Sequence, residues 1–209
     1  MPSWDNCKDW DYANHPDRLE VTRRCAFIVK AFRRKPADFD QYGLSTKAGH
    51  AFMFAGMAPA QCAKLIGHYR GEHYPCLKKY AVTVRDDPRV GVKPAAVLAR
   101  MVQFEQNLAS ALKIFDSSFG QNLSPQHSAL RLAKFVDLIC LFLVEFLTVH
   151  PYANGNGHTA RLLVWILLGR YGFWPKHWTL DASPNYHQAI ASYRSGNKTD
   201  LRDFMLACI

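Results

Sequence analysis

The sequence has few of the features that would assign it to a class at once. Its 209 residues include six cysteines, which lie far apart and form no CxxC pair. The longest apolar run, residues 138–144, is too short to cross a bilayer, and the first residues have no basic-then-apolar secretion signal. We therefore expect reduced cysteines, no membrane association and a cytoplasmic location, unless a secretion system exports the protein as an effector without a classical signal.

The charge balance favours anionic partners. The chain has 26 Lys and Arg residues against 17 Asp and Glu residues, a formal net charge of +9. Such a surface attracts nucleotides, acidic proteins or nucleic acid without choosing among them. Because the basic residues are scattered and form no long arm, nucleic acid is the least favoured of these partners. Hydrophobic residues make up 49% of the chain, enough for the core of one domain.

Hydrophobic periodicity and turn residues predict a mainly α fold with one short β-hairpin. The hairpin would pair Tyr80–Val84 with Val90–Val92. A helix start is expected near Pro59, and the N-cap residues of two later helices would be Ser124 and Thr199. The predicted helices are Glu20–Phe32, Pro94–Lys113, Ser124–Val149, Gly157–Tyr171, Pro184–Tyr193 and Thr199–Ala207.

One loop carries a pattern typical of phosphate chemistry. Residues 150–161 read HPYANGNGHTAR and lie between two strongly helical segments. Glycines in such a loop let backbone N–H groups surround an anion, and the following helix directs its positive end to the same place. Arg161 is placed to bind a phosphate, and His150 is a candidate proton acceptor. The alternative, a glycine-rich turn with a chance histidine, leaves the rest of the pattern unexplained.

This segment resembles the loop of Fic/Doc family proteins, H-P-F-x-D/E-G-N-G-R-x-x-R, which lies between two helices. Matching features continue on both sides, in residues 161–173 after the loop, in Tyr186–Phe204, and in residues 67–70 before the hairpin. The resemblance implies a single Fic-type helical domain over residues 1–209. Its core would be 94–206, its hairpin flap 80–92, and residues 1–70 an N-terminal helical extension of unclear role.

The resemblance also implies an activity. Fic-type enzymes transfer part of a nucleotide, most often AMP from ATP, to a hydroxyl of a target protein, here a Ser, Thr or Tyr side chain. His150 would be the general base and Tyr152 the buried anchor of the loop. The flap would dock the target through Val82, Thr83 and Val84. The phosphate-binding residues would be Asn154, Gly155, Asn156, Gly157, His158 and Arg161.

Two loop positions depart from the family pattern. Asn154 stands where the family has an acidic residue that helps hold Mg²⁺, and His158 stands where it has the first arginine. Magnesium prefers carboxylate oxygen, so we expect weakened Mg²⁺ binding at Asn154. One negative and one positive group are lost together, which suggests altered donor binding with the local charge roughly kept.

Other functions stay open at this level. The chain could be a catalytically silent nucleotide-binding or interaction module, or a Doc-like protein phosphotransferase toxin. No segment matches the family's inhibitory motif, since none of its candidate glutamates has the required flanking residues, so a separate inhibitor (antitoxin) protein would supply any inhibition. A zinc site is a weaker hypothesis, because its possible ligands match no common spacing. These ligands are Cys62, His68, His73 and Cys76.

Overall fold

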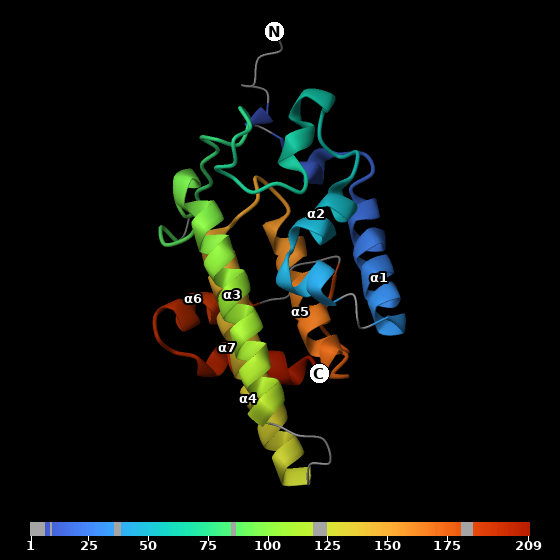
Figure 1. Cartoon of the computed structure of the whole chain (residues 1–209), viewed down its shortest axis with the longest axis vertical. Coiled ribbons are helices and arrows are strands. Elements are labelled where there is room, and N and C mark those ends of the chain that lie inside the picture. Colours follow the sequence, from blue (N-terminus) through green and yellow to red (C-terminus); the bar gives the residue numbers. More distant parts are fainter. Residues whose placement is uncertain (1–6, 9, 36–38, 85–86, 119–124, 181–185) are drawn as a thin grey trace.

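The chain folds into long α-helices joined by shorter helical turns (Figure 1). The computed structural model describes residues 7–8, 10–35, 39–84, 87–118, 125–180 and 186–209. The α-helices are α1 (Leu19–Arg34), α2 (Lys47–Phe54), α3 (Pro94–Ser118), α4 (Pro125–Val149), α5 (Asn156–Arg170), α6 (His187–Arg194) and α7 (Thr199–Ala207). The shorter turns are η2 (Tyr12–Asn14), η4 (Asp40–Leu44) and η5 (Ala60–Leu65).

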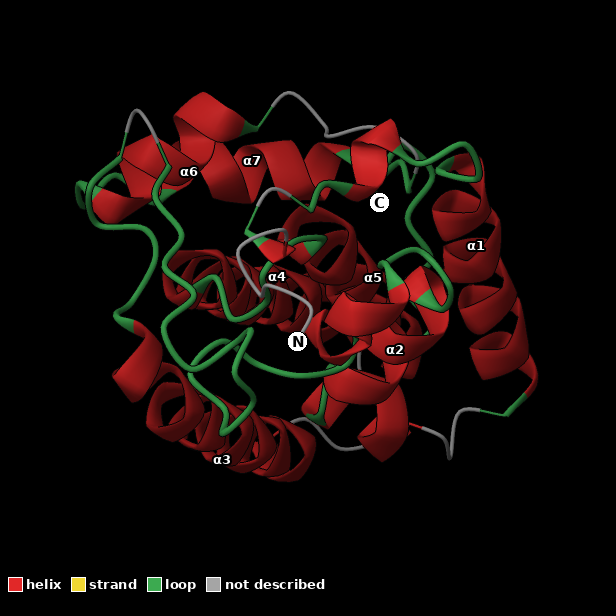
Figure 2. Cartoon of the chain, turned by 90° about the horizontal axis from the view of Figure 1, so that it is seen from above, coloured by secondary structure: helices red, strands yellow, loops and turns green. Residues whose placement is uncertain are grey.

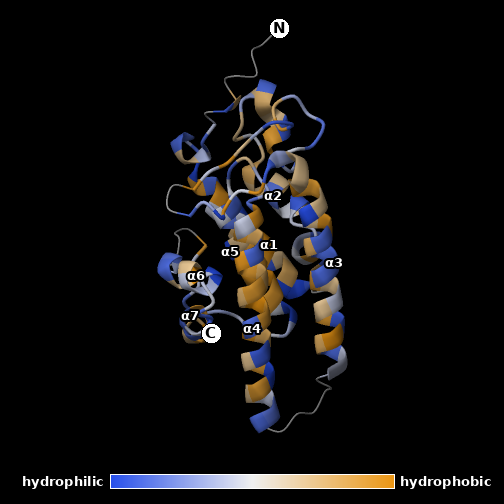
Figure 3. Cartoon of the chain, turned by 90° about the vertical axis from the view of Figure 1, so that its left-hand side faces the viewer, coloured by the Kyte–Doolittle hydropathy of each residue, from blue (hydrophilic) through white to orange (hydrophobic). Residues whose placement is uncertain are grey.

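Helix α5 lies at the centre of the bundle, beside α1 and α4 (Figure 2). Between Ala160 and Gly169 its only charged residue is Arg161, and nearly every side chain of the helix is buried. A helix that is apolar on all sides must be enclosed by others, which explains this position. Helix α4 also packs on α3 and α7, and the apolar residues concentrate along α4 and α5 (Figure 3).

The helices predicted from the sequence are confirmed, with some corrections at their ends. Ser124 and Pro184 lie outside the described residues, so the predicted cap and start there are not described. Thr199 is the first residue of α7 and not its N-cap, which is Lys198. The reason lies just upstream, where the Asn197 side chain accepts the N–H of Thr199 at 3.0 Å and fills the capping role.

The predicted β-hairpin is wrong as a pair of strands. In the described part of the chain, Tyr80–Val84 and Val90–Val92 have no strand structure. Their backbone groups bond elsewhere, because the carbonyls of Tyr80 and Val92 accept hydrogen bonds from the buried Arg70 side chain. The N–H of Gly91 donates to the carbonyl of Thr148 in α4 at 3.0 Å. The segment is therefore an extended loop bound to α4 and Arg70, with little of the mutual pairing that makes a ladder.

The expectation of six reduced cysteines is also wrong. Cys7 and Cys62 form a disulfide across a Cα–Cα distance of 5.6 Å. The two come together because the Trp10 indole donates to the carbonyl of Met57 at 3.0 Å, which fixes the N-terminal segment beside η5. The remaining cysteines are buried free thiols, namely Cys25, Cys76, Cys140 and Cys208. No described helix has the length and apolar character needed to cross a membrane.

Arg70 is a fully buried cation that joins three parts of the chain. Its Nε donates to the carbonyl of His150 at 2.8 Å, and its Nη2 donates to that of Val149 at 3.0 Å. Two more bonds, both 3.1 Å, reach the carbonyls of Tyr80 and Val92. Burial lowers the pKa of Arg70 to about 10, so the guanidinium stays charged at neutral pH. The end of α4 and the 80–92 segment are held to each other through this side chain.

We expect Arg70→Met to lower the free energy of unfolding by about 3–5 kcal/mol, because several buried carbonyls lose their donor at once. Urea unfolding followed by circular dichroism measures the change. The matched control is Arg23→Met on α1, whose side chain is 73% exposed. It should change the free energy of unfolding by less than about 0.5 kcal/mol. Equal stability of the two variants would contradict the role given to Arg70.

Candidate active site

His150 lies at the point where α4 gives way to the loop, in an uncommon backbone conformation. Its φ is 52°, in the left-handed region that few non-glycine residues adopt. Pro151 follows it and disfavours continuation of the helix. Arg70 fixes this geometry from both sides, since its Nε binds the carbonyl of His150 and its backbone N–H donates to the carbonyl of Pro151 at 2.8 Å. The direction of the imidazole is thus set by buried hydrogen bonds.

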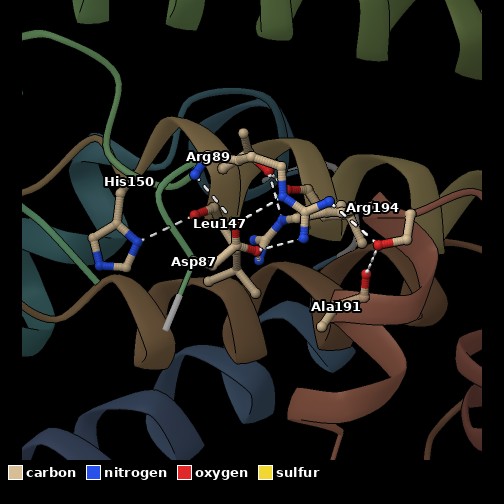
Figure 4. A network of polar contacts seen from close by, with 9 residues as sticks. Asp87, Arg89, Leu147, His150, Ala191 and Arg194 are labelled. Atoms are coloured by element: carbon tan, nitrogen blue, oxygen red, sulfur yellow. Dashed lines mark hydrogen bonds and ion pairs between the residues drawn. The ribbon is translucent and has the colours of Figure 1, made fainter. Parts of the chain in front are cut away.

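The imidazole of His150 has a defined proton arrangement. Its Nδ1 lies 3.2 Å from the carbonyl oxygen of Leu147 (Figure 4). A carbonyl can only accept, so Nδ1 carries the proton and Nε2 carries the lone pair. Burial lowers the pKa of His150 to about 4, and the charges of Arg70 and Arg194 act in the same direction. The ring is therefore neutral at physiological pH, with Nε2 able to accept a proton.

Tyr152 anchors the middle of the loop in the core. Its ring is fully buried and stacks on His50 with 3.8 Å between centroids, while its hydroxyl shares a 2.7 Å hydrogen bond with Thr46. The Asn156 side chain closes the turn, because its Oδ1 accepts the N–H of Tyr152 and its Nδ2 donates to the carbonyl of Tyr152, each at 2.9 Å. The Asn156 amide thus shapes the loop, and any contact with an anion is left to its backbone.

Two side chains of α2 support the glycine turn. His50 accepts the N–H of Gly67 at Nδ1 and donates from Nε2 to the carbonyl of Asn154 at 3.0 Å. Burial lowers the pKa of His50 to about 3, which keeps it neutral. Phe54 lies against Gly155, whose φ is 78°, and a Cβ added there would come within 2.3 Å of the Phe54 ring. Only glycine suits both the dihedral angle and the space.

The N-terminal end of α5 gives the site its positive character. The helix begins at Asn156, has no side-chain cap and has no acidic residue in its first turn. The guanidinium of Arg161 passes beside Gly157, where an added Cβ would lie 3.3 Å from Nη1. Its Nη2 also donates to the carbonyl of Leu180 at 3.4 Å. A helix N-terminus with a buried arginine behind it is suited to phosphate oxygens.

A pocket of about 320 Å³ brings His150 and Gly157 together. Its wall includes Val84 from the expected flap, and α6 contributes Ile190 and Arg194. Of the other two expected flap residues, Thr83 is exposed, and the carbonyl of Val82 lies against Gly91. The structure therefore places the candidate base, the start of α5 and one flap residue around a common space.

An ionic cluster fixes the far wall of this pocket (Figure 4). Asp87 accepts hydrogen bonds from Arg89 at 2.7 and 3.0 Å and from Arg194 at 3.1 Å. These donors, Arg89 first, hold the pKa of the Asp87 carboxyl well below its usual range. Arg194 also donates to the hydroxyl of Thr148 in α4 at 3.0 Å. The cluster joins residues 87–89 of the expected flap to α6 and α4.

The two variant loop residues face away from this pocket, toward the N-terminal segment. Asn154 donates from Nδ2 to the carbonyl of Trp10 and to Asp11, and its Oδ1 accepts the N–H of Gly155 at 2.7 Å. His158 is buried and shares a 2.8 Å hydrogen bond with the Tyr12 hydroxyl. Neither side chain is directed as a free ligand at the glycine turn.

The donors for nucleotide phosphates fit the residues present, whereas the donors for Mg²⁺ fit only in part. The described residues include no group of three His, Cys, Asp or Glu side chains that could hold a metal by themselves. A magnesium ion needs only one or two carboxylates when phosphates supply the rest, and the carboxylate nearest the variant loop position is that of Asp11. The zinc hypothesis loses one ligand, because Cys62 is disulfide-bonded.

Sequence reasoning missed the residues that support the loop from outside the motif. His50 and Phe54 lie in an apolar stretch that resembles ordinary core, and a histidine in such a stretch is the only signal they give. Arg194 and Asp87 lie 107 positions apart, and neither has a local pattern that reveals the pair. Trp10 to Tyr12 were part of an extension with no assigned role.

Comparison with protein-family models finds a match with the Fic/DOC family over residues 50–168, more than half of the chain. The matched region begins at His50 and includes the loop and nearly all of α5. No curated protein matches the sequence.

We expect Gly155→Ala to destabilise the protein by about 2–4 kcal/mol, since it adds a steric clash with Phe54 to the cost of the left-handed backbone. The matched control is Gly172→Ala, which has the same φ of 78° and open space around it. It should lose only about 1–2 kcal/mol. Thermal unfolding compares the two, and adding Phe54→Leu should recover part of the loss in the first variant. Equal losses of stability in the two variants would show that the Phe54 ring moves aside without an energetic cost.

We expect the His150 ring to titrate near pH 4 and not near its usual 6.5, because burial disfavours the imidazolium. NMR of protein with ¹³C-labelled histidine measures this, with His150→Gln assigning the signal. Because the folded-state pKa is lowered, the stabilisation is present above about pH 6.5 and is lost as the pH falls toward 4. A midpoint near 6.5 would contradict the buried geometry.

Proposed function

Because this chain belongs to the Fic/DOC family, we propose that it is a transferase that moves a nucleotide-derived group, AMP from ATP, to a hydroxyl of a target protein. The observation that carries the proposal is the placement of His150. Its Nε2 lone pair is available because Leu147 holds Nδ1–H, and the ring shares a pocket with Gly157 at the start of α5. A proton acceptor beside a phosphate-binding turn is what such a transfer needs.

The electrostatics of the loop support an anionic donor. The Arg161 guanidinium lies beside Gly157 at the N-terminal end of α5, whose first turn has no acidic residue to oppose a phosphate. The formal net charge of +9 favours encounter with polyanions in general. These groups would stabilise charge on the phosphates as it shifts toward the leaving group.

In the proposed step, the target hydroxyl oxygen attacks the α-phosphorus of ATP. The bond between that phosphorus and the oxygen bridging to the β-phosphate breaks, and pyrophosphate leaves with the electron pair. The hydroxyl proton passes to Nε2 of His150, which is neutral beforehand and becomes imidazolium. Burial makes that imidazolium acidic, so it releases the proton readily after the transfer.

The exposed segment before the pocket suits a protein substrate. Thr83 and Val84 are exposed, and Val84 also borders the pocket that contains His150. An extended stretch of target chain beside residues 82–84 would bring a Ser, Thr or Tyr side chain to the mouth of this pocket.

The test is labelling of a cell lysate with ATP carrying ³²P at the α- or the γ-phosphate. We expect label from the α position only, and a loss of at least about a hundredfold in the rate with His150→Ala, the size typical of a lost general base. The matched control is His177→Ala, which removes an exposed histidine outside the pocket and should keep the rate.

Each other outcome selects a different function. Label from the γ-phosphate alone would make the protein a phosphotransferase of the Doc kind. Label that survives in His150→Ala would remove His150 from the mechanism. No label from either position would favour a silent nucleotide-binding module, and binding of nucleotides by calorimetry would then decide between that module and another donor.

A further inference from the structure

A second hollow, of about 490 Å³, adjoins the start of the expected flap and is larger than the pocket that contains His150. Cationic side chains form much of its wall, and the described residues that line it include no acid. The cations are Lys8, Lys78 and Lys79, all exposed, and the less polar surface comes from Cys76, Tyr80 and Ala81. A negatively charged group that enters this hollow meets lysine side chains and no carboxylate of the described wall.

The wall of this hollow is held in place by hydrogen bonds of the backbone. The carbonyl of Leu77, a fully buried residue, accepts the N–H of Tyr80 at 3.0 Å, and the N–H of Lys78 donates to the carbonyl of Tyr74 at 2.9 Å. The Tyr80 hydroxyl donates to the carbonyl of Lys8 at 3.1 Å, which joins this turn to the N-terminal segment. The lysine side chains therefore extend from a backbone that is ordered before any partner binds, which lowers the entropic cost of binding.

One segment of the chain connects this hollow to the active-site pocket. Ala81 lines the hollow, and Val84, which follows it closely in the sequence, lines the pocket that contains His150. Extended chain between these two positions spans at most about 11 Å. A stretch of target chain beside residues 82–84 would therefore place a side chain about three or four residues from the reacting hydroxyl at the lysine-lined hollow.

We propose that the hollow with Lys78 and Lys79 binds an acidic segment of the target protein, with Asp or Glu side chains about three or four residues from the modified hydroxyl. The proposal rests on the function proposed above and names the class of substrate for the same site. The position favours protein over nucleic acid, because the hollow borders the residues that a target chain would contact. Two adjacent lysines also form a short cluster and not the long basic track that a polyphosphate backbone uses.

The test uses synthetic peptides with a central Ser, Thr or Tyr and a Glu-Glu pair at varied distances on either side, each matched by a Gln-Gln peptide. Binding to the full chain is measured by fluorescence anisotropy without ATP, and transfer is measured with ATP labelled at the α-phosphate. We expect the Glu-Glu peptides to bind about tenfold more tightly than the Gln-Gln peptides, as two exposed ion pairs allow. In the transfer assay, KM should be lowest when the pair is about three or four residues from the centre.

Charge exchange identifies the residues responsible. The double variant Lys78→Glu with Lys79→Glu should bind the Glu-Glu peptide at least about tenfold more weakly and should gain affinity for a Lys-Lys peptide. The matched control is Lys30→Glu with Lys134→Glu, which changes the net charge equally at exposed positions of α1 and α4 outside the hollow. It should keep the wild-type preference for glutamate. All four side chains are exposed, so the thermal midpoints of both double variants should stay close to that of the wild type.

The other outcomes overturn the inference in distinguishable ways. Equal affinity for the Glu-Glu and Gln-Gln peptides, or an equal loss of preference in both double variants, would leave only a general effect of net charge. A KM that does not depend on the position of the glutamates would separate the hollow from the active site. Tighter binding of a single-stranded oligothymidylate, lost only in the Lys78 and Lys79 variant, would assign the hollow to nucleic acid.

The two readouts also separate this inference from the proposed function. Acidic peptides that bind through Lys78 and Lys79 but accept no label, in a protein that labels nothing in a lysate, would support the docking surface and overturn the transfer. Label on peptides or lysate proteins without any effect of glutamates or of the Lys78 and Lys79 variant would support the transfer and overturn the docking surface.

Discussion

The buried guanidinium of Arg70 is the interaction on which the other features of the site depend. It donates to carbonyls at the end of α4 and in the 80–92 segment, two parts of the chain that are distant in sequence. A helix end and an extended loop both leave carbonyls without partners, and burial of either would be costly. A planar cation with several donors satisfies both at once. The left-handed backbone of His150 and the course of the flap segment follow from it.

The loop of residues 150–157 has two faces with different tasks. The face that contains His150 and Gly157 opens on the pocket beside α6, and its groups are the ones that suit proton and phosphate chemistry. The other face is used for support, through the stack of Tyr152 on His50 and the contact of Phe54 with Gly155. A loop with so few large side chains of its own is held in place by contacts with α2, α4 and the N-terminal segment.

Local sequence patterns were sufficient for the helices and for the loop, and insufficient for what supports them. The apolar period of α3 and α4 and the glycines after Pro151 act over a few residues, so their structure could be predicted. The hairpin prediction failed because β-propensity in Tyr80–Val84 describes a tendency to be extended, while the hydrogen-bond partner was a distant arginine. The Cys7–Cys62 bond and the Asn154–Asp11 pair depend on tertiary contacts between distant parts of the chain, which spacing does not encode.

The hydrogen bonds between an N-terminal segment and a loop more than 140 positions later have a consequence for comparing members of this family. A twelve-residue motif has the same properties in two proteins only if the residues that contact it are also the same. Here Asn154 and His158 take their surroundings from Asp11 and Tyr12. Two chains with identical loops can therefore differ in nucleotide binding when the residues around the loop differ. Two chains with different loops can likewise have similar nucleotide binding. For chains of this fold, the residues that contact the loop are a better basis for comparing chemistry than the motif sequence alone.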